Sequence, residues 1–487
     1  MTRRLTAAAL LWLPLAAAAA TPCAALRTLS LPQARIHSAV QVAAGDRLAL
    51  WAGGQAQAMP KAFCRVRGTA SPVIGSAIGF EVWLPEAAAW NGKYLQAGNG
   101  GTAGSVPLPS LLDGVVRGYA TAATDGGHLW PDGLDYGWAN GRPESVVDFG
   151  WRAVQRTTLA AKRIVAAGLG AAPKKSYFIG CSDGGRDALM AAQRMPRAFD
   201  GIVAGAPALA WLDLMAAGAL VQRELSGHVA ALPVAKLPAL QAAALAACGQ
   251  GKAYVADPSS CRFDPAAMAC GDADTAACLT PRQVDLVRQI YRGIPEPGTG
   301  RILPGLMPGA EADPGNWDFW LLRAPINPLG GSDAAGAPPT SIGESFFRHL
   351  VREEPSFTFG DLNAEDLALA RRRWSADLDA TDPDLRAFER HGGKLLQYHG
   401  WADSAVPPRM SIDYHQAVQG RMGDTSAFYR LFMVPGMNHC AGGNGPWQTD
   451  WLGALERWVE AGTPPAAILA RHPSREDSQT LRPHTPR

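Results

Sequence analysis

A serine in the pentapeptide "G-C-S-D-G" has the surroundings of a nucleophile. Ser182 lies between Gly180 and Gly184, an apolar run at 177–179 precedes it, and a helical pattern follows from about Gly185. A sharp strand-to-helix turn exposes a serine hydroxyl, and it needs residues without bulk two positions away on either side. The pattern predicts a nucleophilic serine on such a turn. The alternative is a glycine-rich turn that contains a serine by chance.

Two later segments offer the base and the acid that such a serine requires. A serine hydroxyl becomes reactive when an imidazole takes its proton and a carboxylate holds that imidazole. A strand expected at 394–398 is followed by a loop with Asp403, and a strand expected at 428–434 is followed by a loop with His439. Open α/β sheets place their chemistry at the carboxyl ends of strands, so these three residues are predicted to form a triad.

Two other histidines are less well placed to be the base. His399, in the strand-end segment "YHGW", is expected to pack or form hydrogen bonds there. The segment "TDGGH" contains Asp125 and His128 and resembles a site, but it precedes the serine. We interpret it as a loop element.

The composition favours a globular enzyme over a nucleic-acid or membrane-surface protein. The chain has 487 residues, of which 47% are hydrophobic and 18% charged, with a net charge of +2. This length allows two or three structural units with a large core. A charge this small gives no reason to expect nucleic acid or an anionic membrane surface as a partner.

Residues 1–20 have the features of a secretory signal peptide. Arg3 and Arg4 precede an apolar stretch, and small residues follow up to a cleavage site near Ala20. The apolar stretch is shorter than the roughly 20 residues of a membrane span, and Pro14 interrupts it. The sequence therefore predicts a secreted or periplasmic protein without a membrane anchor.

In an exported chain the cysteines are expected to form disulfides. The chain has eight of them, namely Cys23, Cys64, Cys181, Cys248, Cys261, Cys270, Cys278 and Cys440. An even number in an exported chain favours disulfides over free thiols. Zinc is the alternative for the four at 248–278, but they lack the paired C-x-x-C spacing and have no histidine among them.

Two cysteines adjoin the predicted catalytic residues. Cys181 directly precedes Ser182, and Cys440 directly follows His439. A bond between these cysteines would tie the nucleophile to the base and limit any drift between them, which matters because a displacement of about 1 Å can remove much of the rate. The alternative is that the two are unrelated structural cysteines.

The "CS…D…HC" arrangement resembles the tannase and feruloyl esterase family, which includes the mono(2-hydroxyethyl) terephthalate hydrolases. The likeness is carried by "YFIGCSDGGRDALMAAQRMPRAFDGIVAGAPA" and "LFMVPGMNHCAGG", and it extends from about Cys23 to near Gly462. It implies an α/β-hydrolase fold in which Ser182 is the nucleophile, Asp403 the orienting acid and His439 the base.

The same resemblance implies further features of the site. The oxyanion hole would consist of the backbone N–H groups of Gly101, in "QAGNGGTAG", and Asp183. The remaining disulfides would be Cys23–Cys64, Cys248–Cys261 and Cys270–Cys278.

The resemblance also implies a large lid domain inserted into the hydrolase. Residues 21–210 and 388–487 would form the catalytic domain and residues 211–387 the lid. Within the lid, "TPRQVDLVRQIYRG" is typical of a helix that Thr280 caps and Pro281 opens. Trp211, Trp317 and Trp320 could form a slot for a flat aromatic acyl group, or they could form the core of the lid.

Two departures from relatives bear on metal and substrate. Relatives carry a calcium loop between the first cysteine pair of the lid, but "CGQGKAYVADPSSC" has Gly249 where an acidic ligand would stand and keeps only Asp257. Calcium takes six to eight oxygen ligands, so we predict that this site is lost and that no cofactor or metal is bound. Asp318 stands where the terephthalate-ester hydrolases have a lid arginine, which argues against that substrate.

The sequence thus predicts a secreted serine esterase whose partner is a small aromatic ester. By resemblance the acyl group is a phenolic acid, gallate or a hydroxycinnamate, released through an acyl-enzyme. The alternatives are a general carboxylesterase for small aromatic esters, a terephthalate monoester hydrolase and a non-catalytic binding protein of the same fold. Nothing in the sequence indicates an oligomeric state.

Overall fold

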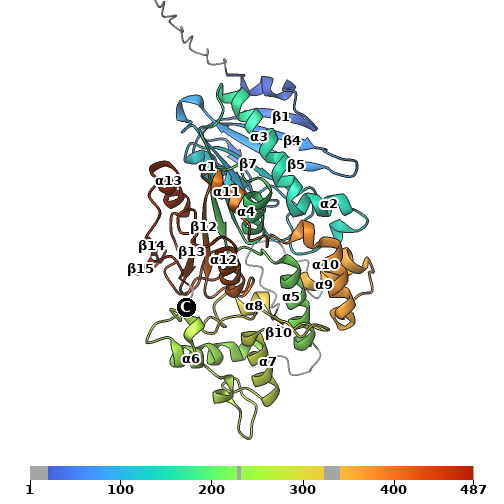
Figure 1. The fold of residues 1–487 in the computed structure, drawn as a ribbon, viewed down its shortest axis with the longest axis vertical. Helices are drawn as coiled ribbons and strands as arrows, with labels where there is room; N and C mark the ends of the chain where they lie inside the picture. The colour runs from blue at the N-terminus through green and yellow to red at the C-terminus, as the bar shows by residue number, and fades with distance from the viewer. Residues whose placement is uncertain (1–19, 227–231, 323–340, 486–487) are drawn as a thin grey trace, which may run out of the picture.

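A computed structural model describes residues 20–226, 232–322 and 341–485. The predicted signal peptide lies almost entirely outside these residues. Within the described ranges, one mixed sheet of nine strands forms the centre of the molecule, in the order β1-β4-β5-β7-β6-β8-β9-β12-β13 (Figure 1). In chain order the strands are β1 (Ala34–Val42), β4 (Phe63–Ala70), β5 (Ile78–Pro85), β6 (Lys93–Ala97), β7 (Ala120–Thr124), β8 (Lys175–Cys181), β9 (Gly201–Gly205), β12 (Lys394–Gly400) and β13 (Tyr429–Val434).

The half of the sheet that positions the site is parallel. From β7 to β13 neighbouring strands run in the same direction, whereas β1, β4, β5 and β7 pair antiparallel. Parallel strands covered on both faces consist of almost continuous apolar residues, and "GIVAG" of β9 is buried throughout. The strands expected at 394–398 and 428–434 are confirmed as β12 and β13.

Helices cover both faces of this sheet. One face packs against α3 (Ala153–Leu169), α4 (Asp183–Arg194) and α12 (Pro408–Met422), and the other against α1 (Leu108–Val116) and α13 (Trp451–Ala461). This three-layer arrangement of helices around a largely parallel sheet is that of an α/β-hydrolase, so the predicted fold class is confirmed. No helix in the described ranges is both long and apolar enough to cross a membrane.

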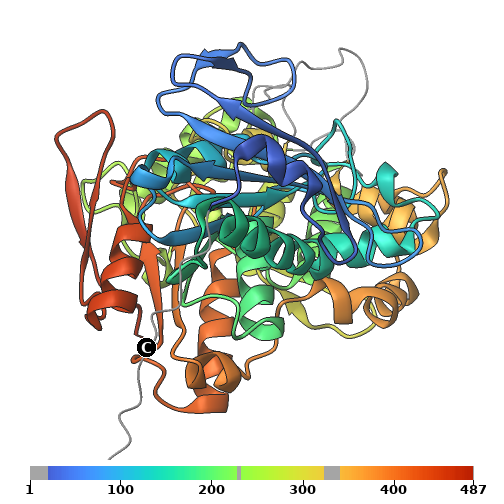
Figure 2. The ribbon, with the colours of Figure 1, turned by 90° about the horizontal axis from the view of Figure 1, so that it is seen from above.

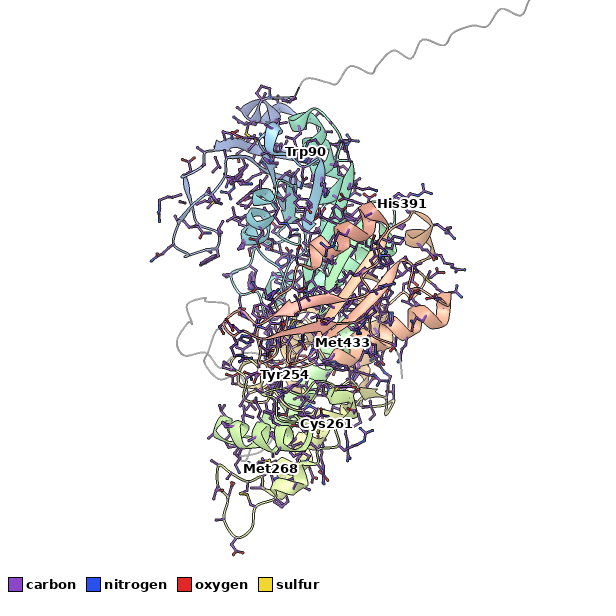
Figure 3. All side chains as sticks on the ribbon, turned by 90° about the vertical axis from the view of Figure 1, so that its left-hand side faces the viewer. Trp90, Tyr254, Cys261, Met268, His391 and Met433 are labelled. Carbon is purple, nitrogen blue, oxygen red and sulfur yellow. A yellow bond between two sulfur atoms is a disulfide. The ribbon has the colours of Figure 1, made fainter. Side chains whose placement is uncertain are left out.

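The predicted lid segment, 211–387, divides into two groups of helices. The helices α6 (Leu237–Cys248) and α7 (Pro281–Arg292) form a lobe at the end of the molecule opposite the N-terminal strands (Figure 1). Cys261 and Met268 belong to this lobe and lie far from Trp90 (Figure 3). Thr280 and Gln283 form a reciprocal capping box at the start of α7, as the sequence predicts for Thr280 and Pro281.

The second group lies beside the hydrolase. The helices α9 (Ile342–Phe346) and α10 (Ala364–Leu378) pack on α5 (Trp211–Ser226) and near α2 (Pro143–Val147), on the side opposite the hairpin of β14 (Ile468–Arg471) and β15 (Ser478–Leu481) (Figure 2). Their apolar side chains share one core with residues 136–149 of the hydrolase. Only the first group, within about 221–322, has a core of its own. The boundaries 211–387 remain a prediction.

Candidate active site

Ser182 lies on a tight turn between β8 and α4. Its backbone has φ 65° and ψ −124°, a conformation that costs a non-glycine residue of order 1–3 kcal/mol. A Cβ atom on Gly180 would lie 2.2 Å from the carbonyl oxygen of Gly184, and one on Gly184 would lie 2.6 Å from that of Asn99. The turn therefore requires both glycines, and it raises the serine at the carboxyl end of the sheet.

Asp403 and His439 lie side by side beyond the ends of β12 and β13. His439 Nδ1 is 2.7 Å from Oδ2 of Asp403, and the aspartate side chain is fully buried. The other carboxylate oxygen, Oδ1, accepts the backbone N–H groups of Ala405 and Val406 at 2.9 and 2.8 Å. The carboxylate can thus hold the imidazole in one orientation and one tautomer.

Asp403 remains ionised although it is buried. Burial alone would raise the pKa of its carboxyl, but the charge of His439 and hydrogen bonds from His399 and His439 outweigh that effect, and the pKa lies below its ordinary value. His399 Nε2 is 3.3 Å from Asp403 Oδ2. The sequence expectation that His399 forms hydrogen bonds at the strand end agrees with this position.

A disulfide joins the residues next to Ser182 and His439. Cys181 and Cys440 are bonded, with their Cα atoms 5.9 Å apart. The described residues contain three further disulfides, Cys23–Cys64, Cys248–Cys261 and Cys270–Cys278, so every cysteine is paired. The turn that carries Ser182 and the loop that carries His439 are therefore covalently connected.

The loop after β6 brings Gly101 beside the serine. β6 pairs with β8, with Ala97 opposite Ile179, so the chain that leaves β6 passes the turn that carries Ser182. Gly101 has φ 58°, and a Cβ on it would lie 2.0 Å from the carbonyl oxygen of Gly133. Only glycine fits there. Asp183 is the first residue of α4, and the first N–H groups of a helix have no partner within it.

A cavity of about 140 Å³ lies between the hydrolase and the predicted lid. Gly101, Ser182 and His439 line one part of it. Most of the remaining wall is apolar and includes Trp211, Met215, Val221, Phe319, Trp320 and Ile342. Among the described residues of the wall there is no Asp, Glu, Lys or Arg. The arrangement offers an uncharged ligand an apolar chamber that opens onto a serine and a histidine.

The comparisons with known proteins decide the family. The family described as "Tannase and feruloyl esterase" matches residues 64–485. The chain belongs to the tannase and feruloyl esterase family.

Individual relatives agree with this assignment. An uncharacterized esterase of Xanthomonas campestris pv. campestris is 40% identical, over 95% of this chain and 86% of its own length. A probable feruloyl esterase of Arthroderma benhamiae is 30% identical, over 86% of this chain and 80% of its own. The crystal structure of an esterase from Aspergillus oryzae superimposes with a TM-score of 0.85 at 26% identity and covers 95% of both chains. This protein is accordingly a carboxylic ester hydrolase.

The three tryptophans predicted to contact substrate lie in different places in this esterase. Trp211 and Trp320 belong to the cavity wall, and the ring of Trp320 is 5.4 Å from that of His439. Trp317 is 1% exposed and packs near Tyr291 inside the lobe of α6 and α7. For Trp317 the structure favours the second alternative, the core of the lid, because its side chain lies in the core of the lobe and not among the described residues of the wall.

Sequence reasoning missed a buried arginine beneath the turn that carries Ser182. Arg186 is fully buried and donates to Oδ1 of Asp183 at 2.6 and 2.8 Å, and to the backbone carbonyls of Phe149 and Gly150. Asp187, also buried, lies 3.6 Å from the same guanidinium. The spacing "SDGGRD", with acids one turn before and one residue after the arginine, was the available signal. This network fixes the first turn of α4.

The segment "TDGGH" supports the site without entering its cavity. Asp125 accepts the backbone N–H groups of Gly79 and Gly127, and its own carbonyl accepts Gly104 N–H at 2.9 Å. His128 stacks on Trp138 with ring centres 3.6 Å apart. These contacts hold the loop that carries Gly101 and agree with its interpretation as a loop element.

The segment between Cys248 and Cys261 is a poor match for the calcium loop that the resemblance implies. Asp257 is its only acidic residue, and Oδ1 of Asp257 accepts the backbone N–H of Ser259 at 3.2 Å in a helix cap. Six to eight oxygen ligands cannot be assembled around one carboxylate that already caps a turn. Loss of the site stays a prediction, tested below.

Proposed function

We propose that this esterase cleaves esters of phenolic aromatic acids, gallate or a hydroxycinnamate, through an acyl-enzyme on Ser182. The observation that carries the proposal is the apolar cavity that contains both Ser182 and His439 in its wall. Its volume of about 140 Å³ is close to the roughly 150 Å³ that accommodates one benzene ring in an engineered protein cavity. The family and its feruloyl esterase members support the same acyl class.

In the proposed mechanism His439 takes the proton of the Ser182 hydroxyl, and the serine oxygen attacks the ester carbonyl carbon. Asp403 stays ionised and stabilises the imidazolium that forms. The backbone N–H groups of Gly101 and Asp183 donate to the oxyanion of the tetrahedral intermediate. Collapse of the intermediate breaks the ester bond, and the alcohol leaves with the proton from His439. Water then repeats the sequence on the acyl-enzyme and releases the acid.

The charge of the cavity wall argues against a terephthalate monoester as substrate. That substrate carries a free carboxylate, and burying an unpaired charge is strongly unfavourable. No Lys or Arg is present among the described residues of the wall. Asp318, at the position where the terephthalate-ester hydrolases have arginine, accepts the backbone N–H groups of Gly315 and Phe319. A neutral phenolic ring matches this wall better.

The compartment belongs to the same proposal. We infer that the protein acts outside the cytoplasm, either secreted or in the periplasm. Four disulfides, with no free cysteine among the described residues, persist in oxidising compartments.

The test is a comparison of esters with the mature protein produced where disulfides form. The substrates are methyl gallate, methyl ferulate, chlorogenate and mono(2-hydroxyethyl) terephthalate, with Ser182→Ala as the blank. We expect at least one phenolic ester to have a kcat/KM about 10-fold or more above that of the terephthalate ester, a difference of about 1.4 kcal/mol. Ser182→Ala should lower kcat by about 10⁴-fold or more.

Two outcomes would overturn parts of this proposal separately. Equal or faster cleavage of the terephthalate ester would reject the phenolic acyl class and leave the triad intact. Substantial activity of Ser182→Ala would reject the serine as nucleophile.

A further inference from the structure

Asn316 connects the predicted lid to the loop that carries the acid. It is 1% exposed and lies just before α8 (Trp317–Trp320). Its Nδ2 donates to the carbonyl oxygen of Ala402 at 3.0 Å, and its Oδ1 accepts the hydroxyl of Ser404. Ala402 and Ser404 are the residues on either side of Asp403. The side-chain amide of Asn316 therefore forms hydrogen bonds with the residues before and after Asp403.

The same amide reaches the loop that carries the base. Asn316 Nδ2 lies 3.4 Å from Oδ1 of Asn438, the residue directly before His439. Asn316 Nδ2 also donates to the carbonyl oxygen of Ala310 at 2.8 Å, which ties it to its own segment. The oxygen and the nitrogen of the amide both form hydrogen bonds. Through them Asn316 connects to the acid loop and to the base loop, each more than 80 residues further along the chain.

Asn316 is also continuous with the aromatic wall of the cavity. Its backbone carbonyl accepts the N–H of Trp320 at 2.8 Å, which starts the short helix α8. Trp320 faces the cavity and its ring lies against that of His439. Asn316 therefore contacts both the helix that carries Trp320 and the two loops that carry Asp403 and His439.

We propose that Asn316 is a positioning residue that holds the Asp403 and His439 loops in register and couples them to the docked lid. This inference rests on the proposed function, since it assigns Asn316 to the alignment of that triad. Buried hydrogen-bond networks that are fully satisfied specify one geometry. Removal of this amide loosens the Asp403–His439 pair, and errors of about 1 Å at such a pair cost on the order of 10²-fold in rate.

The chain offers a matched control in Gln241. Its Nε2 donates to Asp313 at 2.8 Å, and its Oε1 accepts the backbone N–H of Ala312 at 2.6 Å. Gln241 is therefore a nearly buried amide of the lid that holds the same segment, a few residues before Asn316. No contact of Gln241 with the acid or base loop is found among the described residues. Asp313 also accepts Nδ2 of Asn444, in the chain after His439, at 2.6 Å, and this donor stays in place when Gln241 is removed. We therefore expect Gln241→Ala to cost stability with little effect on the triad.

The experiment compares Asn316→Ala with Gln241→Ala. Three quantities are measured: Tm, kcat and KM for methyl ferulate, and the rate at which a small fluorophosphonate labels Ser182. The label needs an aligned serine and histidine but little of the acyl cavity. We expect both variants to have a lower Tm. Asn316→Ala should lose about 10- to 100-fold in both kcat and labelling rate, whereas Gln241→Ala should stay within about 2-fold of the parent in both.

A charged variant measures the electrostatic effect of position 316 on His439. Asn316→Asp places a carboxylate next to the triad loops, and a nearby negative charge favours a protonated imidazole. The acidic limb of the kcat/KM profile should shift to higher pH in Asn316→Asp and stay in place in Gln241→Ala. Should Asn316→Ala fail to fold, Ser404→Ala removes only the hydroxyl that donates to Asn316, and it should still slow labelling several-fold.

The outcomes separate this proposal from the proposed function. Labelling and kcat of Asn316→Ala that fall no more than those of Gln241→Ala, despite an equal loss of Tm, would overturn the positioning role. If Asn316→Ala does not fold, labelling of Ser182 at the parent rate in Ser404→Ala would likewise overturn the positioning role. A parent protein whose Ser182 is not labelled at all would instead overturn the serine mechanism.

Discussion

His399 and His439 both face one oxygen of Asp403, with ring nitrogens 3.3 and 2.7 Å from Oδ2. His399 Nε2 is also 3.0 Å from the carbonyl oxygen of Val406, which can only accept, so Nε2 carries the hydrogen. The hydroxyl of Ser411 lies 2.6 Å from the other ring nitrogen. The single hydrogen on His399 Nε2 is thus shared between the Val406 carbonyl and Asp403 Oδ2, on the side of this oxygen that His439 leaves free.

This arrangement predicts a loss of activity in His399→Phe. The variant removes one donor to Asp403, so the carboxylate is held less firmly, and kcat should fall about 10-fold. It also removes the donor to the Val406 carbonyl and the ring nitrogen beside the Ser411 hydroxyl, which should cost about 1–3 kcal/mol of stability. Steady-state kinetics and thermal unfolding measure the two effects.

His415→Phe is the control for that prediction. His415 is also buried and packs edge-on against Tyr429, with ring centres 4.8 Å apart. No contact with Asp403 is found for it among the described residues. We expect kcat to stay within about 2-fold in this variant. An equal fall of kcat in both variants would show that the effect of His399→Phe is general.

Adjacent glycines give a test of the oxyanion loop. Gly101→Ala would place a Cβ 2.0 Å from the Gly133 carbonyl oxygen at φ 58°, so the loop must move away from Ser182. Loss of one oxyanion donor costs about 10²–10³-fold in kcat, and we expect a loss of that size. At Gly100 a Cβ would meet nothing within 4 Å. Gly100→Ala should therefore retain nearly full kcat, and similar losses in both variants would contradict the assignment.

The disulfide beside the triad should contribute to both stability and rate. Cys181 and Cys440 are 259 residues apart, and a ring of that size stabilises by about 5 kcal/mol in chain-entropy terms. The double variant Cys181→Ala/Cys440→Ala should unfold at a lower temperature and lose at least about 10-fold in kcat. The pair Cys248→Ala/Cys261→Ala, in the lobe, should lose stability alone. Full kcat in the first double variant would mean that the bond does not align the site.

Calcium should be neither bound nor required. Asp257 alone cannot supply the ligands, so dialysis against a chelator should leave Tm and kcat unchanged. Metal analysis of the dialysed protein should find much less than one calcium per chain. Stoichiometric calcium that survives dialysis, or a loss of Tm that added calcium reverses, would contradict this expectation.

The stability of the fold should depend on pH through Asp125. Burial raises the pKa of its carboxyl from 3.8 to about 7, and nearby Asp148 adds to this, against hydrogen bonds from Gly127 and Gly79. The folded state therefore binds more protons than the unfolded state between these pH values, and stability falls as pH rises from about 4 to 7. Asp125→Asn lacks this dependence.

The measurement is the free energy of unfolding of both proteins from pH 4 to pH 8. As pH rises across this range, the free energy of unfolding of the parent should fall relative to that of Asp125→Asn by up to about 4 kcal/mol. Urea unfolding at each pH gives the values. A difference that does not change with pH would show that Asp125 is ionised throughout.

The parts of the site that follow directly from local sequence were predictable. The glycines around Ser182 mark the turn, and the apolar runs of β8, β12 and β13 place three loops at one edge of a parallel sheet. Each of these signals lies within about ten residues of the side chain that it positions, because a buried strand and the loop after it are local features.

Other parts depend on contacts between distant segments and could not be read from the sequence. Arg186 is buried because Phe149 and Gly150 supply acceptors from another helix. Trp317 looks like Trp320 in the sequence, and only the packing near Tyr291 assigns it to a core. The helical pattern of α10 does not say which core it joins, so its position beside the hydrolase was not foreseen.

The span of the Cys181–Cys440 bond sets an order for the maturation of the chain. The other three disulfides close rings of 41 residues or fewer, so each can form once its own short stretch has emerged. The fourth needs residue 440, which follows the predicted lid and β13 in the chain. The Cys181–Cys440 bond thus depends on parts of the chain that lie 259 residues apart coming together in the fold. Afterwards, a single proteolytic cut anywhere between residues 181 and 440 would leave both fragments joined in one molecule.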